Sequence, residues 1–217
     1  MSKVSIKDFS ILSEQDKQEA VALLHRYDQI DKQDVCQNDF INFVKHLWPE
    51  FIEGRHHKII GEKFNRIAEG KLKRLIVCLP PRHSKSEFAS TYFPAWMMGR
   101  KGDLKIIQTT HTAELAVRFG RKVRNIIDSE EYSHIFPDLK LQADNKSAGR
   151  WTTNQEGESF YAGVGGAITG RGADLLIIDD PHSEQDALSP KSLESAYEWY
   201  TSGPRQRLQP GGIIVIV

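Results

Sequence analysis

The sequence lacks the features that mark secreted, membrane-spanning or metal-clustered proteins. It has two cysteines, too few for a disulfide framework, and neither has a second Cys or His at metal-ligand spacing. No apolar run is long enough to cross a bilayer, and charged residues interrupt the N-terminus where a signal peptide would lie. These absences predict a cytosolic protein in which Cys36 and Cys78 are packing residues.

The sequence also lacks net charge, because 29 Lys and Arg residues balance 29 Asp and Glu residues. A DNA-coating protein is usually basic, so any contact with nucleic acid must come from a local patch or from residues displayed in an assembly. What is present is ordinary for a globular chain, with 39% hydrophobic residues, four Trp and ten Phe in 217 residues. This length predicts one core, or one domain with a small appendage.

Residues 1–70 are predicted to form an N-terminal helical region, and residues 71–217 an α/β core. A capping-box pattern at Ser13 starts the first helix, and a polar stretch over 28–38 follows it. Apolar spacing predicts a second helix that ends at Trp48-Pro49 and a third that ends at Gly70.

The segment from Arg74 to Ala89 has the order strand, tight loop, helix. Leu75–Leu79 is a short apolar run typical of a parallel strand buried on both faces, and a Pro-Pro pair ends it. The following helix opens with Lys85-Ser86, as in a phosphate-binding loop, where Lys reaches the outer phosphates and the hydroxyl binds magnesium. Leu79 and Ser84 stand where the strict pattern has glycines. A strand-to-helix turn with a surface lysine is therefore the alternative.

A second buried-strand pattern, Asp174–Asp180, ends in two acids. In phosphate-loop enzymes such a strand lies beside the loop strand, and its carboxylates hold magnesium and orient the attacking water. We expect Asp179 to be the metal acid with Ser86, and Asp180 to be the water-orienting base. The alternative is a turn or helix cap at Pro181, but both halves in one chain favour nucleotide hydrolysis.

Two further positions have alternative interpretations. His57 either packs against the adenine base with the Trp48-Pro49 turn, or is one of an exposed pair near a helix start. Arg171 lies in the glycine-dense segment 163–172. It is either a cation directed at a nucleotide, in its own subunit or a neighbour's, or a surface arginine paired with Asp174.

Two segments between the predicted strands carry polar or basic residues. The helix predicted after Thr112 has basic residues largely off its apolar face, which form either a solvated surface or a DNA-contacting one. The polar stretch from Pro137 to Gly157 predicts an exposed excursion.

Four segments together resemble the ATPase domain of the large terminase subunit of tailed bacteriophages. They are 79–87, 166–174, 175–181 and 210–217. The resemblance runs from about Trp48 to the end of the chain. It implies a RecA-like P-loop NTPase fold of the ASCE type, with a mainly parallel central sheet and an N-terminal helical lid region.

The resemblance also implies site residues and ligands. ATP and Mg²⁺ are the expected cofactors. The nucleotide-binding loop would be Pro81, Arg82, His83, Ser84, Lys85 and Ser86, with Ser86 and Asp179 at the metal. Arg82 would be the loop arginine, Asp180 the catalytic carboxylate, and Arg171 the arginine that reaches a neighbouring subunit's nucleotide. Ser84 in place of glycine and Asp180 in place of the commoner Glu are departures, and the shorter Asp leaves general-base efficiency open.

The implied function is ATP-driven packaging of double-stranded DNA into a procapsid. The implied partners are DNA, the portal of the procapsid, the small terminase subunit and further copies in a ring, with a monomer in solution as an alternative and no membrane. The place would be the host cytoplasm during virus assembly, and not the mature virion. The family's coupling motif and nuclease domain have no counterpart in these residues, so no nuclease activity is expected. A helicase-like nucleic-acid-dependent ATPase and a nucleotide-binding module with impaired catalysis remain alternatives.

Overall fold

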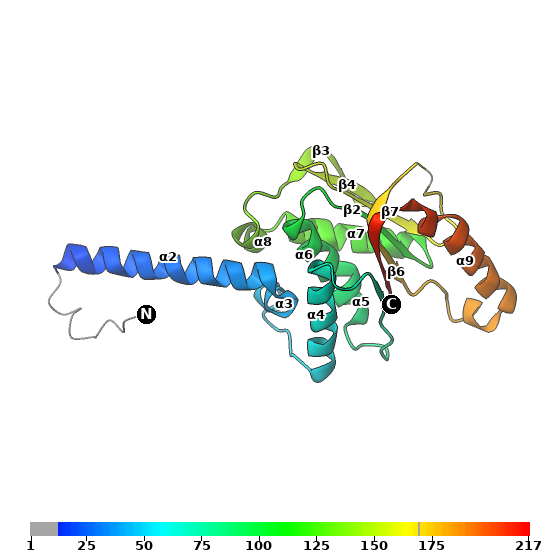
Figure 1. Cartoon of the computed structure of the whole chain (residues 1–217), viewed down its shortest axis with the longest axis horizontal. Coiled ribbons are helices and arrows are strands. Elements are labelled where there is room, and N and C mark those ends of the chain that lie inside the picture. Colours follow the sequence, from blue (N-terminus) through cyan, green and yellow to red (C-terminus); the bar gives the residue numbers. More distant parts are fainter. Residues whose placement is uncertain (1–12, 169) are drawn as a thin grey trace.

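The central feature of the fold is one sheet covered by helices on both faces (Figure 1). The computed structural model describes residues 13–168 and 170–217. Within these residues seven strands form the order β1-β7-β6-β2-β5-β4-β3. The pairings among β1, β7, β6, β2 and β5 are parallel, and those of β4 with β3 and β5 are antiparallel. This arrangement is consistent with the RecA-like ASCE fold and confirms the predicted fold class.

The bounds of the elements are as follows. The strands are β1 Arg74–Ile76, β2 Lys105–Thr110, β3 Leu141–Ser147, β4 Arg150–Thr153, β5 Glu158–Gly163, β6 Ala173–Asp179 and β7 Leu208–Ile216. The helices are α2 Glu14–Asn38, α3 Phe40–Leu47, α4 Arg55–Ala68, α5 Lys85–Glu87, α6 Phe93–Arg100, α7 Ala113–Ile127, α8 Glu130–Ile135 and α9 Pro190–Ser202. A π-helix, η1 Phe88–Tyr92, joins α5 to α6, and the 3₁₀ turns are η2 Asp186–Leu188 and η3 Pro204–Arg207.

The first described helix is longer than predicted. Residues 1–12 of the predicted 1–70 region lie outside the described residues, and Ser13 caps α2 by accepting a hydrogen bond from the amide of Asp16. The helix then continues through the polar stretch 28–38, where its end had been expected. Two glutamines in that stretch, Gln33 and Gln37, donate to the carbonyl of Ile135 on α8. Polar anchoring therefore holds a segment whose apolar pattern alone does not predict a helix.

The sheet has two apolar faces because successive strand residues point in opposite directions. One face carries Ile106, Leu175, Ile177 and Val215. The other carries Ile107, Leu176, Ile178 and Ile214, against which Tyr200 of α9 packs. This alternation within continuous apolar runs is typical of a sheet covered on both sides.

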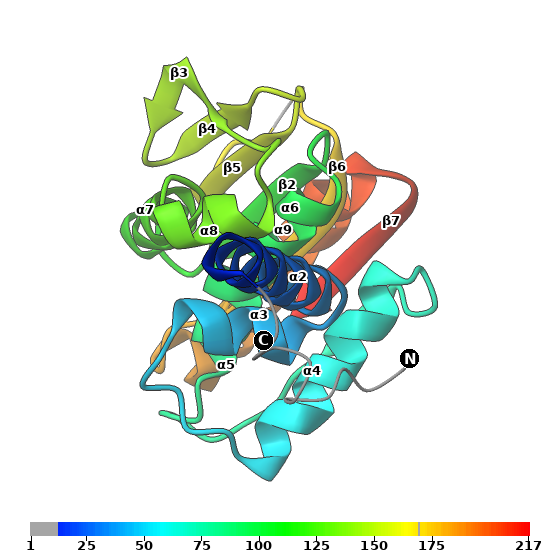
Figure 2. The ribbon, with the colours of Figure 1, turned by 90° about the vertical axis from the view of Figure 1, so that its left-hand side faces the viewer.

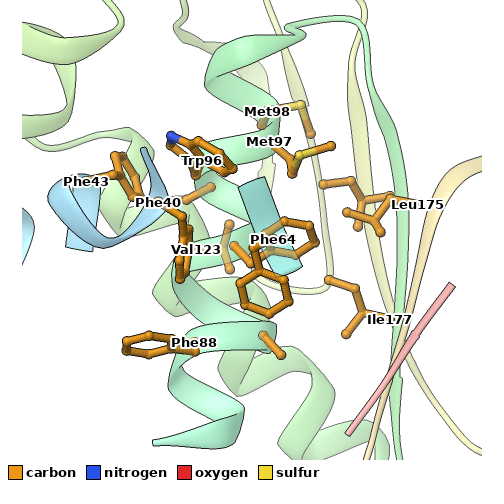
Figure 3. Close-up of a cluster of buried hydrophobic side chains, with 14 of the residues drawn as sticks. Phe40, Phe43, Phe64, Phe88, Trp96, Met97, Met98, Val123, Leu175 and Ile177 are labelled. Carbon is orange, nitrogen blue, oxygen red and sulfur yellow. The ribbon is translucent and has the colours of Figure 1, made fainter. Parts of the chain in front are cut away.

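The larger core contains an aromatic cluster that joins the N-terminal helices to the sheet (Figure 3). The ring of Phe40 in α3 meets Phe64, Phe88 and Trp96 edge to face, at centroid distances of 4.9, 5.3 and 5.6 Å. Phe64 of α4 stacks on Phe93 at 4.0 Å. Helices α3 and α4 therefore contribute to the same core as the sheet.

The prediction for the first strand is wrong in one respect. The run Leu75–Leu79 was expected to be a strand buried on both faces, but β1 has three residues and Ile76 is 68% exposed. The reason is topological, because β1 pairs with β7 on one side and no other described strand lies beyond it. Apolar composition does not distinguish an edge strand from a central one.

The stretch 137–157 was expected to be an exposed excursion, and most of its described residues are exposed or half-buried. Its conformation was not predicted, because most of it forms the β3-β4 hairpin. Trp151 in β4 is fully buried, and its indole Nε1 donates to the carbonyl of Gly120 in α7 at 3.2 Å. An antiparallel strand at the margin of a sheet buries one face only, which explains its polar composition.

Candidate functional site

The loop between β1 and α5 has a strained backbone. Arg82 has φ 65° and Ser84 has φ 61°, both in the left-handed region that non-glycine residues rarely adopt. Each such residue costs about 1–2 kcal/mol, and strain of this kind clusters at functional sites. When residues close together in the chain adopt the left-handed conformation, their backbone N–H groups can point into one concavity that binds anions. The loop therefore has the backbone form of a phosphate-binding turn without the expected glycines.

The two acids at the end of β6 point in different directions. Asp179 is 1% exposed, whereas the side chain of Asp180 is 52% exposed. The backbone reverses at Asp180, which has φ 43°. Its carbonyl accepts from the amide of His111 at 3.2 Å, and its amide donates to the carbonyl of Val217 at 3.2 Å. Strands β2 and β7 therefore fix this turn, with one carboxylate buried and the other open to solvent.

The loop and the two acids lie together. The ammonium of Lys85 forms an ion pair with Asp180, and the hydroxyl of Ser86 donates to Asp179 Oδ1 at 3.0 Å. One expectation was wrong, because β1 and β6 are not neighbouring strands and β7 lies between them. The side chains nevertheless meet, since they come from the ends of parallel strands at one edge of the sheet.

A residue that the sequence analysis missed completes the environment of Asp179. The hydroxyl of Ser90 donates to Asp179 Oδ2 at 2.7 Å, so each carboxylate oxygen accepts one serine hydroxyl. Ser90 lies in the π-helix η1, and its carbonyl accepts from Gln108 Nε2 of β2 at 3.1 Å. The available signal was the spacing of Ser86 and Ser90, which places both on one face of a helix.

Burial has the largest effect on the proton affinity of Asp179. It raises the pKa of the carboxyl, and the negative charge of Asp180 acts in the same direction. The hydrogen bonds from Ser90 and Ser86 and the charge of Lys85 oppose this shift. A divalent cation at this carboxylate would supply the positive charge that the buried site lacks.

A cavity of about 970 Å³ opens in front of these groups. Its lining includes the loop residues Pro81, Arg82, Ser84, Lys85 and Ser86, together with His111, Asp180 and the segment 182–185. Ligand sites commonly have volumes of about 300–1,000 Å³, which accommodates a nucleoside triphosphate. His83 is directed elsewhere, with its Nδ1 2.9 Å from the carbonyl of Pro81.

The residues present fit a magnesium ion that is shared with a phosphate ligand. Within residues 13–168 and 170–217, no group of three or more His, Cys, Asp or Glu side chains could hold a metal on its own. Mg²⁺ usually takes one or two protein ligands and fills its octahedral shell with phosphate oxygens and water. Ser86 and Asp179 would be those protein ligands.

No known protein family matches the chain by sequence, and no curated protein matches it. Among solved structures, the chain is similar to the crystal structure of the HK97 bacteriophage large terminase, with a TM-score of 0.48 and 9% sequence identity. The similarity covers 76% of this chain and 33% of that chain. The chain therefore spans about a third of the length of the structure it matches.

Arg171 lies away from the cavity. Its guanidinium forms an ion pair with Glu158 of β5 and lies over the ring of Phe160, 4.0 Å from the centroid. The expected alternative, a pair with Asp174, is also not formed, because the Asp174 carboxylate accepts from the amide of Lys105. A role toward a neighbouring subunit's nucleotide stays a prediction.

His57 is buried rather than exposed. Its Nδ1 accepts from the amide of Gly54 at 2.9 Å, and its ring packs 4.8 Å from Phe51 and 4.9 Å from Phe88. Burial lowers the pKa of the imidazole, which therefore favours the neutral form. The interpretation as an exposed pair is wrong for this residue, and the contact with adenine stays a prediction.

The left-handed serine of the loop gives a first testable prediction. Ser84→Gly should raise the free energy of unfolding by about 1 kcal/mol, because glycine adopts a positive φ without steric cost. Urea denaturation measures this change. The matched control is Ser129→Gly, since Ser129 caps α8 at φ −82° and its loss should cost a few tenths of a kcal/mol. Equal destabilisation by both changes would contradict strain at Ser84.

Proposed function

We propose that this chain is a magnesium-dependent ATPase. The observation that carries the proposal is the meeting of Lys85 with Asp180, and of Ser86 with Asp179, beside one cavity. The loop and the acidic strand are far apart in the sequence and not adjacent in the sheet. The alternative interpretation, a surface lysine on an ordinary strand-to-helix turn, does not explain why Lys85 and Ser86 contact two consecutive acids next to a strained loop.

Each group has a role that follows from its chemistry. Backbone amides of residues 82–84 would bind phosphate oxygens, and Lys85 would neutralise the outer phosphates. Ser86 and Asp179 would hold the metal ion, which supplies Lewis-acid stabilisation of charge on the phosphates. Arg82 lines the cavity and would add a second positive charge near the phosphates.

The ion pair between Lys85 and Asp180 implies an exchange of partners on binding. Lys85 cannot serve a phosphate and remain fully paired with Asp180. When its ammonium turns to the ligand, the Asp180 carboxylate becomes free to accept a hydrogen bond and then a proton from water. Asp180 is suited to this role, because its side chain is open to the cavity whereas Asp179 is buried.

We further propose that the ATPase is the motor domain of a DNA-packaging terminase. The motifs at 79–87, 166–174, 175–181 and 210–217 support this, as does a core that places two of them at one site. The substrate moved would be double-stranded DNA, and the partners the small terminase subunit, the procapsid portal and further copies of the chain. Arg171 would then act between copies.

Steady-state ATP hydrolysis against protein concentration, with and without duplex DNA, tests this function. We expect Mg²⁺-dependent hydrolysis whose rate per chain rises with concentration and with DNA. Stimulation by single strands alone would favour a helicase-like ATPase. ATP binding in calorimetry without phosphate release would select a binding module, and absence of binding would contradict nucleotide chemistry altogether.

Ser90 gives a second prediction, on metal binding. Ser90→Ala should lower the affinity for Mg²⁺ in the nucleotide complex by about 10- to 100-fold, because the carboxylate of Asp179 loses the hydroxyl that orients it. Magnesium titration of the binding of a fluorescent ATP analogue measures the change.

The control is Thr91→Val, which removes a neighbouring buried hydroxyl that has no hydrogen-bond partner among the described residues. Thermal stability measured in parallel separates a folding defect from a metal defect. Equal magnesium affinity in the two variants would contradict the role of Ser90.

A further inference from the structure

The imidazole of His182 has a buried nitrogen that lacks a hydrogen-bond partner. Its Nε2 atom makes no hydrogen bond among the described residues. Of the buried side-chain atoms without a partner in the described part of the chain, it is the one whose residue lines the cavity of Lys85 and Asp180. The other histidine of that cavity, His111, has its Nδ1 3.3 Å from the carbonyl of Asp180. A buried polar atom without a partner costs free energy, so a ligand in this cavity is a candidate partner for Nε2.

The backbone on both sides of His182 is held in place, whereas its ring nitrogen is not. Two residues earlier, Asp180 is hydrogen-bonded to the residues directly after β2 and β7. One residue later, the amide and the hydroxyl of Ser183 donate to the carboxylate of Asp186, at 3.1 and 2.6 Å. Rotation about the side-chain bonds is therefore the movement by which Nε2 comes out into the cavity.

The ring of His182 also lines a second cavity, of about 370 Å³. This cavity lies between the glycine-dense segment and helix α9, and its lining includes Gly165 and Trp199. Helix α9 lies on the face of the sheet opposite to that of α6 (Figures 1 and 2). His182 is thus shared by the cavity of Lys85 and the cavity beside α9. A turn of its ring toward the first changes the lining of the second.

The ion pair of Lys85 with Asp180 indicates which part of a nucleotide lies near His182. In the proposed function Lys85 exchanges Asp180 for the outer phosphates, so the terminal phosphate comes to lie beside Asp180. His182 is two residues from Asp180 and lines the same cavity. A phosphate oxygen is an acceptor and an imidazole N–H is a donor, so the two groups match. A nucleoside diphosphate has no group at this place.

We infer that His182 determines the preference for a nucleoside triphosphate over a diphosphate, by turning its ring and donating from Nε2 to the terminal phosphate. The inference rests on the proposed function and adds a specificity-determining residue to it. The hydrogen bond has a charged acceptor, which makes it stronger than one between neutral groups. Because it forms with the triphosphate alone, its whole contribution is a difference between the affinities for the two nucleotides.

Isothermal titration calorimetry of the whole chain with Mg²⁺ tests the inference, using a non-hydrolysable ATP analogue and ADP. His182→Ala should weaken binding of the analogue by about tenfold and leave the affinity for ADP within about twofold. Retained ADP binding also shows that the variant is folded. The control is His134→Ala, since His134 on α8 is 67% exposed, lines neither cavity and should leave both affinities unchanged.

The outcomes separate this inference from the proposed function. If the wild type bound neither nucleotide, the proposed ATPase would be wrong, and the inference with it. If the wild type bound both nucleotides and His182→Ala kept the same ratio of affinities, the inference alone would be overturned.

Two further variants test the donor atom. Glutamine places an amide N–H₂ group about where imidazole has Nε2, whereas the shorter asparagine reaches only the position of Nδ1. His182→Gln should therefore keep most of the preference for the triphosphate, and His182→Asn should lose it as His182→Ala does. Equal losses in His182→Gln and His182→Asn would overturn the role of Nε2.

Trp199 gives a readout of the turn of the ring that does not depend on affinity. Its indole Nε1 donates to the carbonyl of Gly166 at 3.3 Å, and it lines the second cavity with His182. Tryptophan emission should change when the ATP analogue binds and not when ADP binds. Trp199→Phe and His182→Ala should each abolish this change. An equal change with ADP, or a change that survives in His182→Ala, would overturn the inference.

Discussion

Lys85→Ala is expected to abolish ATP turnover and most nucleotide binding. Lys85 lines the cavity and pairs with Asp180. Its side chain is only 19% exposed, so solvent water would compensate poorly for the loss of its positive charge. Removing one preorganised group that stabilises the transferred phosphoryl group typically costs on the order of 10²- to 10³-fold in turnover. Phosphate release measures the rate, and isothermal titration calorimetry with a non-hydrolysable ATP analogue measures the affinity.

The matched control for this variant is Lys122→Ala. Lys122 of α7 also forms an ion pair with an acid of the loop region, Glu87, but its side chain does not line the cavity. Its removal should change stability by less than about 1 kcal/mol and leave most of the turnover. If Lys85→Ala retained hydrolysis at the level of Lys122→Ala, the assignment of the phosphate-binding lysine would be wrong.

Asp179→Asn is expected to separate stability from function. The variant should lose Mg²⁺-dependent nucleotide binding by about 100-fold or more, since the metal loses its buried carboxylate. The ligand-free protein should nevertheless be more stable than the wild type at neutral pH. Asparagine keeps acceptor and donor atoms for Ser86 and Ser90 but does not place a charge where burial already raises the pKa.

The pH dependence of this gain has a definite sign. The folded protein holds the Asp179 proton more tightly than the unfolded chain, in which the pKa is near 3.8. Protonated Asp179 therefore contributes its full stabilisation of the folded wild type below pH 3.8. That contribution to the free energy of unfolding is lost as the pH rises through the raised folded pKa. Thermal denaturation should show the two proteins close together in acid and the variant above the wild type at pH 7.

Asp180→Asn is the control for Asp179→Asn. Its side chain is half exposed, so neutralising it should change stability by about 0.5 kcal/mol or less, while hydrolysis falls because the water-orienting carboxylate is lost. A stability gain in Asp180→Asn equal to that in Asp179→Asn would contradict the burial argument.

The sequence predicted the helices and strands that can be recognised from a local apolar pattern and its caps. The run Asp174–Asp180 contains nearly all of β6, which ends at Asp179, and the helix expected after Thr112 is α7, capped by that threonine. The place of β7 between β1 and β6 could not be predicted, because apolar runs carry no information on their neighbours in a sheet. The β3-β4 hairpin was missed for a related reason, since only Trp151 distinguishes its buried face from an exposed loop.

The candidate site was predictable where chemistry and spacing coincide. Lys85, Ser86, Asp179 and Asp180 stand at the ends of two predicted strands, and the structure brings them together. The spacing of Ser86 and Ser90 suggests that the two side chains share a helix face, but the sequence does not show that a π-helical turn directs Ser90 to Asp179. Arg171 was predicted from its place in the glycine-dense segment and from the family resemblance, and neither specifies that Glu158 is its partner.

The π-helix η1 has a consequence for how this protein tolerates insertions and deletions. A π-turn contains one residue more than an α-turn of the same height. Deleting one residue between Phe88 and Tyr92 would let this turn wind as a regular α-helix, and the flanking segments would keep nearly the same rotational phase, because both kinds of turn complete one revolution. The aromatic anchor at Phe93 and Trp96 would therefore keep its place. A deletion at Phe88 or Ala89 would instead shorten the spacing of Ser86 and Ser90, so that the two hydroxyls would no longer reach the two oxygens of Asp179 together. The extra residue thus decides which side chain of this turn meets the buried carboxylate, and a length change there should impair metal binding before it unfolds the core.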